Sequence, residues 1–231
     1  MTVTALCMTH NRRLWLPLAI ECFQRQTYPA RMLILADGED VTDIVPAEER
    51  IQLYVMPQRA ATTGEKCNVA SRLAESEVIC MWDDDDWSEP GRIADQVSRL
   101  EQTGRAVTGY HSMKFTDGHN WWLFNGPVNS VAGTSLCYRR EWWAGHPFRP
   151  LNVGYDHYFL YAAREAGQLV TVDDKGLMHA SIHPRNSAAR FLDEPCWQRI
   201  GGNALDPATT ACRLSGGGLV DLSQPYLAGE R

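Results

Sequence analysis

Short apolar runs alternate with stretches in which apolar residues recur at helical spacing along the first part of the chain. A short continuous apolar run is typical of a strand buried on both faces of a sheet, and the helical recurrence predicts amphipathic helices. The pattern predicts strands at Val3–Met8, Met32–Ala36, Ile51–Met56 and Val78–Trp82. It predicts helices at Trp15–Phe23, Lys66–Ser76 and Pro90–Gln102. This alternation predicts an α/β fold with a parallel, doubly wound sheet.

The second half of the chain changes character. Asp117 and Gly118 separate two apolar segments, Met113–Phe115 and Trp121–Phe124, which predicts a β-hairpin. Short strands are expected at Ser135–Tyr138, Val170–Val172 and Leu177–His179, and a helix over Asp156–Ala166. Periodicity is lost from about Cys196 onward. We therefore predict one domain over residues 1–195, divided into halves 1–105 and 106–195, and a tail or lid over 196–231.

Composition limits the broad class. A chain of 231 residues, 44% of them hydrophobic, suits one α/β domain with a sizeable core and a tail. A net charge of −6 does not suggest an obligate nucleic-acid binder. Without a bilayer-length apolar run or an N-terminal signal pattern, we expect a cytoplasmic protein and no membrane insertion. Buried thiols rather than disulfides are expected for the cysteines in apolar patterns: Cys7, Cys22, Cys67, Cys80 and Cys137.

The predicted strand Val78–Trp82 runs directly into four consecutive carboxylates, Asp83 to Asp86, followed by Trp87. Ligands of open α/β sheets bind outside the carboxyl ends of the strands. Four aspartates there repel one another unless a positive charge neutralises them, and Mg²⁺ or Mn²⁺ is the natural partner of clustered carboxylates. The alternative is a solvated acidic turn that caps the next helix. The strand and the flanking tryptophans favour the metal interpretation.

Polar residues also end two other predicted strands. Thr9 follows the first strand and Asp37 the second. Because the carboxyl ends of parallel strands meet at one edge of a sheet, Thr9, Asp37 and Asp83 are expected to lie along the same edge. That arrangement is typical of a nucleotide site.

A set of short motifs now becomes visible in order along about residues 1 to 190. They are Met8–Arg12, Gln26–Pro29, Ala36–Gly38, Gly64–Asn68, Asp83–Arg92 and Gly154–Asp156. Each is short, but the ordered set resembles the GT-A fold glycosyltransferases, most closely the family 2 type. The resemblance implies a mostly parallel sheet flanked by helices with a mixed second half. It also implies a nucleotide-binding first half and an acceptor-binding second half.

The resemblance further implies residues that bind the nucleotide-sugar donor. These would be Thr9, Asp37, Lys66, Asp83, Asp84 and Arg185. Thr9 and Asp37 would bond to the base and ribose, and the Arg185 guanidinium could hold two phosphate oxygens together. The alternatives are an ordinary turn residue for Asp37, before Gly38, and a solvated helix end for Lys66.

Metal and acceptor residues follow from the same resemblance. Asp83 and Asp85 form the DxD pattern, with Asp85 the first choice of metal ligand, and His183, ranked above His179, would complete the metal shell. Asp86 would lie at the acceptor edge. Trp121 and Trp122 could form an acceptor platform, because aromatic rings stack on the apolar faces of sugars. The alternative for these tryptophans is a hydrophobic hairpin packed on the core.

Asp156 is the expected general base. An inverting transfer needs one carboxylate that takes the proton of the acceptor hydroxyl. The family usually has Glu-Asp here, whereas this chain has Tyr155 and Asp156, so the helper carboxylate is in doubt. The alternative for Asp156 is an N-cap of the following helix.

Together these residues imply a metal-dependent, inverting glycosyltransferase that uses Mn²⁺ or Mg²⁺ and moves a sugar from a UDP-sugar to an acceptor hydroxyl. The acceptor could be a glycan, a lipid, a protein or a modified nucleic-acid base. A nucleotidyltransferase is one alternative, although the chain lacks a Gly-rich phosphate loop after the first strand. A non-catalytic sugar- or nucleotide-binding module of the same fold is another. The presence of Asp83, Asp85 and Asp156 together disfavours it.

Overall fold

The structure is a computed structural model that describes residues 1–186, 192–202, 211–213 and 219–221, the last two segments and Gly202 by their backbone alone. Its strands are β1 (Val3–Thr9), β2 (Arg31–Ala36), β3 (Ile51–Val55), β4 (Val78–Met81), β5 (Trp87–Ser88), β6 (Val107–Thr116), β7 (Asn120–Asn125), β8 (Cys137–Arg139), β9 (Leu169–Asp173), β10 (Met178–Ser181), β11 (Trp197–Gly202), β12 (Ala211–Arg213) and β13 (Leu219–Asp221). Its helices are α1 (Leu16–Gln24), α2 (Thr63–Leu73), α3 (Arg92–Thr103), the 3₁₀ turn η1 (Gly133–Ser135), α4 (Arg140–Gly145) and α5 (Tyr155–Glu165).

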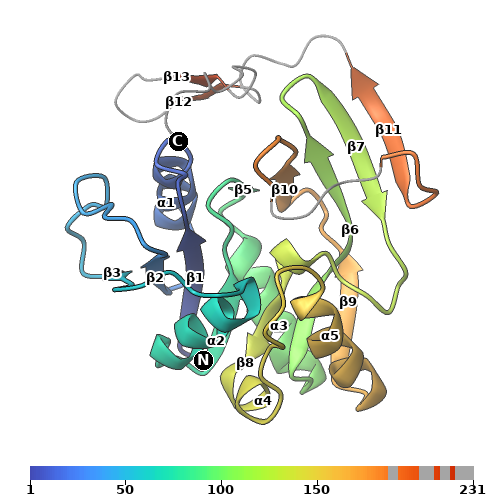
Figure 1. Ribbon diagram of the computed structural model, residues 1–231. Coiled ribbons are helices and arrows are strands. Elements are labelled where there is room, and N and C mark those ends of the chain that lie inside the picture. Colours follow the sequence, from blue (N-terminus) through green and yellow to red (C-terminus); the bar gives the residue numbers. More distant parts are fainter. Residues whose placement is uncertain (187–191, 203–210, 214–218, 222–231) are drawn as a thin grey trace.

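One large sheet organises the domain. Its main path runs β11-β7-β6-β8-β4-β1-β2-β3, with β3 and β2 on the left of Figure 1 and β7 and β11 on the right. The pairs β1–β2, β1–β4 and β2–β3 are parallel, whereas β8 is antiparallel to both β4 and β6. The predicted α/β fold, parallel in its first half and mixed in its second, is confirmed.

Helices pack on both faces of this sheet. On one face, α1 and α3 pack through residues such as Phe23 and Val97 against β1, β2 and β4. On the other face, α2, α4 and α5 pack through residues such as Cys67 and Phe159. The five cysteines expected in apolar surroundings are all buried. Two buried layers of side chains therefore hold the central strands rigidly in place.

Several element boundaries differ from the sequence-based expectation. Helix α2 begins at Thr63 instead of Lys66, because Thr62 and Glu65 form a capping box that satisfies free backbone N–H groups at its start. Gly64 within it lies so close to the backbone oxygen of Arg149 that a Cβ would be 1.8 Å from that oxygen. The hairpin around Gly118, whose φ is +89°, is confirmed as β6 and β7.

The expectation of irregular structure from Cys196 onward is wrong for the next six residues. Trp197–Gly202 form β11, which pairs antiparallel with β7 and extends the sheet. Gly201 and Gly202 obscure the strand pattern in the sequence, and tertiary pairing overrides that low local propensity. Where the tail or lid begins stays a prediction, as does the division at residue 105.

In the part of the chain that the structure describes, every helix is too short or too polar to cross a bilayer.

Arg92, at the start of α3, connects the sheet to η1. Its side chain is 1% exposed and lies over the Trp82 ring, 4.9 Å from the ring centroid. The guanidinium donates to the backbone oxygens of Met81 at 2.7 Å and Thr134 at 2.9 Å. It thereby holds the end of β4 against η1, and both η1 and the segment that follows β4 contribute residues to the site described next.

Replacing Arg92 with methionine should lower the free energy of unfolding by about 3 kcal/mol, because two buried carbonyls lose a charged donor. Urea denaturation followed by circular dichroism measures this loss. Arg99→Met on the same helix is the control. Its pair with Asp95 is partly exposed, so it should cost less than about 1 kcal/mol. Equal losses in the two variants would contradict the role given to Arg92.

Candidate active site

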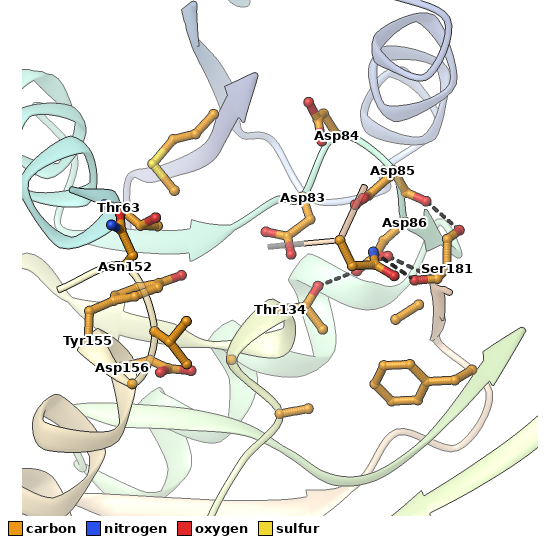
Figure 2. A pocket seen from close by; sticks show the side chains of 18 of the residues that line it. Thr63, Asp83, Asp84, Asp85, Asp86, Thr134, Asn152, Tyr155, Asp156 and Ser181 are labelled. Carbon is orange, nitrogen blue, oxygen red and sulfur yellow. Dashed lines mark hydrogen bonds between the residues drawn. The ribbon is translucent and has the colours of Figure 1, made fainter. Parts of the chain in front are cut away.

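A cavity of about 270 Å³ opens at the carboxyl ends of β1 and β4. It brings together residues from all parts of the domain, namely Met8, Arg12, Thr63, Lys66, Asp83, Asp84, Asp85, Asp86, Phe115, Phe124, Ala132, Gly133, Thr134, Asn152, Val153, Gly154, Tyr155, Asp156, Ala180, Ser181, Asn186 and Trp197. Figure 2 shows Asp83 to Asp86 along one side and Asp156 across from them. Of the polar strand ends expected to meet at one edge, Asp83 lines this partly open cavity.

Three of the four aspartates converge. Asp83, Asp85 and Asp86 each offer a carboxylate oxygen, and these atoms lie within 4.8 Å of one another. Asp86 is fixed by the backbone N–H of Ser181, which donates to its Oδ1 at 2.9 Å, and by the hydroxyl of Thr134. Asp86, which we expected at the acceptor edge, thus belongs to the same group as the predicted ligands Asp83 and Asp85.

Arg12 provides the nearest positive charge. Its Nη1 lies 2.7 Å from Asp84 Oδ1 and 2.5 Å from Asp85 Oδ2. Its Nη2 donates to the backbone oxygen of Arg185 at 2.7 Å, which ties the loop after β1 to the segment after β10. Arg12 belongs to the motif Met8–Arg12, but the sequence alone assigned it no role. Only the proximity of the two loops in the fold reveals the contact.

His183 contacts the acidic group, and His179 does not. The Nε2 of His183 lies 2.8 Å from Asp85 Oδ2, while its Nδ1 accepts from the backbone N–H of Arg185 at 3.1 Å. Neutral His183 therefore carries its proton on Nε2 and donates it to Asp85. His179 stacks on Trp87, and burial lowers its pKa to about 4, so it is neutral.

Negative charge exceeds positive charge in this group. Burial first, and then repulsion from Asp85, raises the pKa of Asp84 to about 7 although Arg12 opposes the shift. The same two causes raise the pKa of Asp83, and burial with repulsion from Asp85 and Asp83 raises that of Asp86 well above its usual range. One guanidinium cannot neutralise four carboxylates. The oxygen donors and the uncompensated charge therefore fit a hard divalent cation.

The predicted donor residues from β1, β2 and α2 meet beside the cavity. Asp37 accepts from the backbone N–H of Ala60 at 2.9 Å and pairs with Lys66 Nζ at 3.3 Å. Thr9 is buried at the end of β1, and its backbone oxygen accepts from Asp37 N at 2.9 Å. Lys66 lines the cavity, whereas Thr9, Asp37 and Arg185 are not among its lining residues. Asp37 is thus held by specific partners, which is more than a turn residue needs.

Asp156 lies in the first turn of α5 and lines the cavity. The N-cap of α5 is Gly154, with φ of +77°, so the alternative that Asp156 caps the helix is wrong. A Cβ at Gly133 would lie 2.2 Å from Asp156 Oδ2, so glycine there lets η1 approach the carboxylate. Burial raises the pKa of Tyr155 well above its usual range, so its phenol stays protonated. It therefore cannot replace the family's helper carboxylate as a negatively charged group.

The aromatic side chains at the cavity differ from those expected. Phe115, Phe124 and Trp197 line it, while Trp121 and Trp122 do not. Trp121 packs edge-on against His179, with ring centroids 5.0 Å apart. The hairpin pattern contained Phe115 and Phe124, and strand alternation was a signal that could have found them. No sequence signal pointed to Trp197.

The raised pKa of Asp84 has a consequence for stability. The folded state keeps a proton up to about pH 7 that the unfolded chain releases near its ordinary pKa. This contribution to the free energy of unfolding is therefore lost as the pH rises through that window. In EDTA, Asp84→Asn should gain on the order of 4 kcal/mol relative to wild type between about pH 4 and pH 7. Urea melts at several pH values measure the difference.

The exposed Asp43→Asn variant serves as the control, because its carboxyl pKa is lowered by Arg13 instead of raised. It should show no such gain. If the difference between wild type and Asp84→Asn were independent of pH, the carboxylate repulsion described here would be contradicted.

Comparison with known proteins agrees with this geometry. The family model described as glycosyl transferase family 2 matches residues 4–164. None of the curated proteins matches the chain. Solved structures of S. aureus TarS share the fold. TarS 1–349 with UDP-GlcNAc has a TM-score of 0.68 and 15% identity over 81% of this chain and 60% of that chain. The same fragment with UDP has a TM-score of 0.66 and 16% identity over 80% and 61%.

The chain thus spans about three fifths of the length of these TarS chains, 60% and 61%. At this identity the likeness shows the fold alone, and it agrees with the mixed α/β sheet described above. The family model, in contrast, extends over more than half of the sequence and includes both Asp83–Asp86 and Asp156. The chain therefore belongs to glycosyl transferase family 2 and has the GT-A type of fold.

Proposed function

We propose that this chain transfers a sugar from a nucleotide-diphosphate sugar, a UDP-sugar, to an acceptor hydroxyl with inversion, and that the reaction depends on Mn²⁺ or Mg²⁺. One observation carries the proposal. A cavity at the carboxyl end of β4 places the carboxylates of Asp83 to Asp86 across from Asp156. UDP is the preferred nucleotide of the donor because TarS, which shares the fold, has been solved with UDP and with UDP-GlcNAc.

Asp83, Asp85 and Asp86 would hold the metal ion, since their oxygens already converge. When bound, the ion supplies positive charge that offsets the diphosphate and stabilises the departing nucleotide. His183 bonds to Asp85 through Nε2, so it would complete the metal shell only after giving up that hydrogen bond. Until then His183 orients Asp85.

Thr9, Asp37 and Lys66 would recognise the nucleotide. Lys66, paired with Asp37 through Nζ at 3.3 Å, presents its ammonium group to the cavity. Asp84, held by Arg12, would contact the ribose. Arg185 lies on the segment after β10, within reach of the loop after β1, and would approach the diphosphate from there.

Asp156 would be the general base. Its carboxylate faces the cavity from α5, on the side away from the aspartates. There it would accept the proton of the acceptor hydroxyl while the oxygen attacks the anomeric carbon opposite the leaving nucleotide. A binding module without turnover would have no use for a carboxylate in this place. Nothing in the site favours nucleotidyl transfer over glycosyl transfer.

The metal and donor roles are tested by thermal unfolding with UDP or UDP-GlcNAc, with and without Mn²⁺ or Mg²⁺. Nucleotide at a hundred times its dissociation constant should stabilise the wild type by about 2.7 kcal/mol, and only with metal. Asp85→Asn should lose this stabilisation because a central ligand is removed. The control Asp43→Asn changes an exposed aspartate that does not line the cavity, and it should keep this stabilisation. Stabilisation that is equal with and without metal would contradict metal dependence.

The role of Asp156 is tested by sugar transfer or donor hydrolysis measured as UDP release. Asp156→Asn should lower turnover by a factor of about 10²–10⁴ and leave nucleotide binding unchanged. Glu165→Gln, an exposed acidic residue on the same helix, is the matched control and should retain activity. Full turnover in Asp156→Asn would remove it as the base. Nucleotide binding without turnover in the wild type would favour the non-catalytic module.

A further inference from the structure

Three aromatic side chains form one wall of the cavity. This aromatic wall consists of Phe115 from β6, Phe124 from β7 and Trp197 from β11. The Trp197 ring lies 4.8 Å from the Phe115 ring and 4.9 Å from the Phe124 ring, measured between centroids. Phe115 and Phe124 are 6.0 Å apart in an edge-on arrangement. The three rings therefore contact one another and act as one apolar surface.

The aromatic wall packs against a hydrophobic core cluster, but only Phe115 is a buried member of that cluster. Phe115 is 3% exposed and packs with Met113, Met178 and Ala180. Trp197 and Phe124 are only partly buried and lie at the edge of this cluster, toward the cavity. The domain buries Trp82 almost completely elsewhere, so it has room for a buried indole. A partly buried indole that lines a cavity leaves part of its ring accessible to a ligand.

Polar groups with fixed positions border the wall. Asp86, Ser181 and Asn186 line the same cavity. Ser181 Oγ donates to the backbone oxygen of Asp85 at 2.5 Å, and Asn186 Nδ2 donates to the backbone oxygen of Ser181 at 3.2 Å. An apolar surface edged by oriented oxygens matches a molecule with an apolar face and a rim of hydroxyl groups. A pyranose ring has this shape, whereas a lipid tail has no groups for the polar edge.

The position of the aromatic wall, away from the proposed nucleotide contacts, favours binding of the acceptor there over binding of the donor. The strand order puts β11, β7 and β6 at one end of the sheet and β1, β2 and β3 at the other. The proposed nucleotide contacts Thr9 and Asp37 lie on β1 and directly after β2. A molecule on the aromatic wall would therefore approach the reacting centre from the opposite side, past Asp86.

We propose that the acceptor is a saccharide whose pyranose ring stacks on the aromatic wall, with Trp197 as the main specificity-determining contact. This inference rests on the proposed glycosyl transfer and adds the chemical class of its acceptor. Trp197 lies beyond residues 4–164, which the family model matches. Strand β11 therefore contributes to the acceptor preference through Trp197, beside Phe115 and Phe124 from the part of the domain that the family model covers.

The test uses protein labelled with 5-fluorotryptophan and ¹⁹F NMR, in which Trp197→Phe identifies the resonance of Trp197. The probes are the methyl pyranosides of glucose, galactose, mannose and N-acetylglucosamine, and the open-chain alditols sorbitol, galactitol and mannitol. At least one pyranoside should shift the Trp197 resonance in a saturable way, and the alditols should not, because they lack a ring face. No shift with any pyranoside, or an equal shift with alditols, overturns the inference.

Variants separate stacking from a structural role of the indole. Trp197→Ala should weaken binding of the responding pyranoside about tenfold, while Trp197→Phe should retain most of it. UDP binding with Mg²⁺ should be unchanged in both. The control Tyr161→Ala removes a ring that is 50% exposed on α5, outside the cavity, and should change neither ligand. If Trp197→Ala weakened UDP binding as much as pyranoside binding, Trp197 would be structural and the inference would fail.

A parallel titration with UDP and Mg²⁺ keeps the two proposals apart. A UDP response without a pyranoside response leaves the proposed transferase intact and overturns the saccharide acceptor. A pyranoside response without a UDP response supports the ring site and contradicts the UDP-sugar donor. If neither responds, both proposals fail.

Discussion

Electrostatic repulsion among four consecutive aspartates constrains the rest of the site. All four residues of β4 are buried, which fixes the position at which the chain leaves the sheet. Asp84, Asp85 and Asp86, which follow, are buried as well. Neighbouring elements limit the cost with directed donors, including the Arg12 guanidinium and the backbone N–H of Ser181. Excess negative charge nevertheless remains, as the raised pKa values of Asp83, Asp84 and Asp86 indicate. A bound cation would lower this repulsion between the carboxylates.

The second half of the domain surrounds this charge. β6 pairs with four strands, β7, β8, β9 and β10, and so carries the sheet from the parallel half to the hairpin. β10 brings Ser181 to the aspartates, while the nearby turn η1 brings Thr134. Gly133 in that turn leaves space for Asp156. The acidic group and the proposed base therefore meet around one short turn, although they lie far apart in the sequence.

The proposed nucleotide-binding and acceptor sides of the site differ in how they are built. The first uses strand ends and helix starts of the parallel half, where backbone geometry repeats and short motifs mark each position. The second uses a hairpin and an added edge strand whose side chains meet only through pairing, as Phe124 does with Trp197 across β7 and β11. Contacts of this kind depend on register, and a register is set by the whole sheet.

The sequence by itself determined the α/β class, most strands, the buried cysteines and the placement of Asp83 to Asp86 at a strand end. These follow from local apolar periodicity, which reports burial directly. The tertiary structure decided what local patterns cannot carry: Arg12 on Asp84 and Asp85, His183 instead of His179 beside the acidic group, and Trp197 instead of Trp121 at the cavity. Each of these depends on loops and strands distant in the sequence, brought together by packing and by the balance of buried charge.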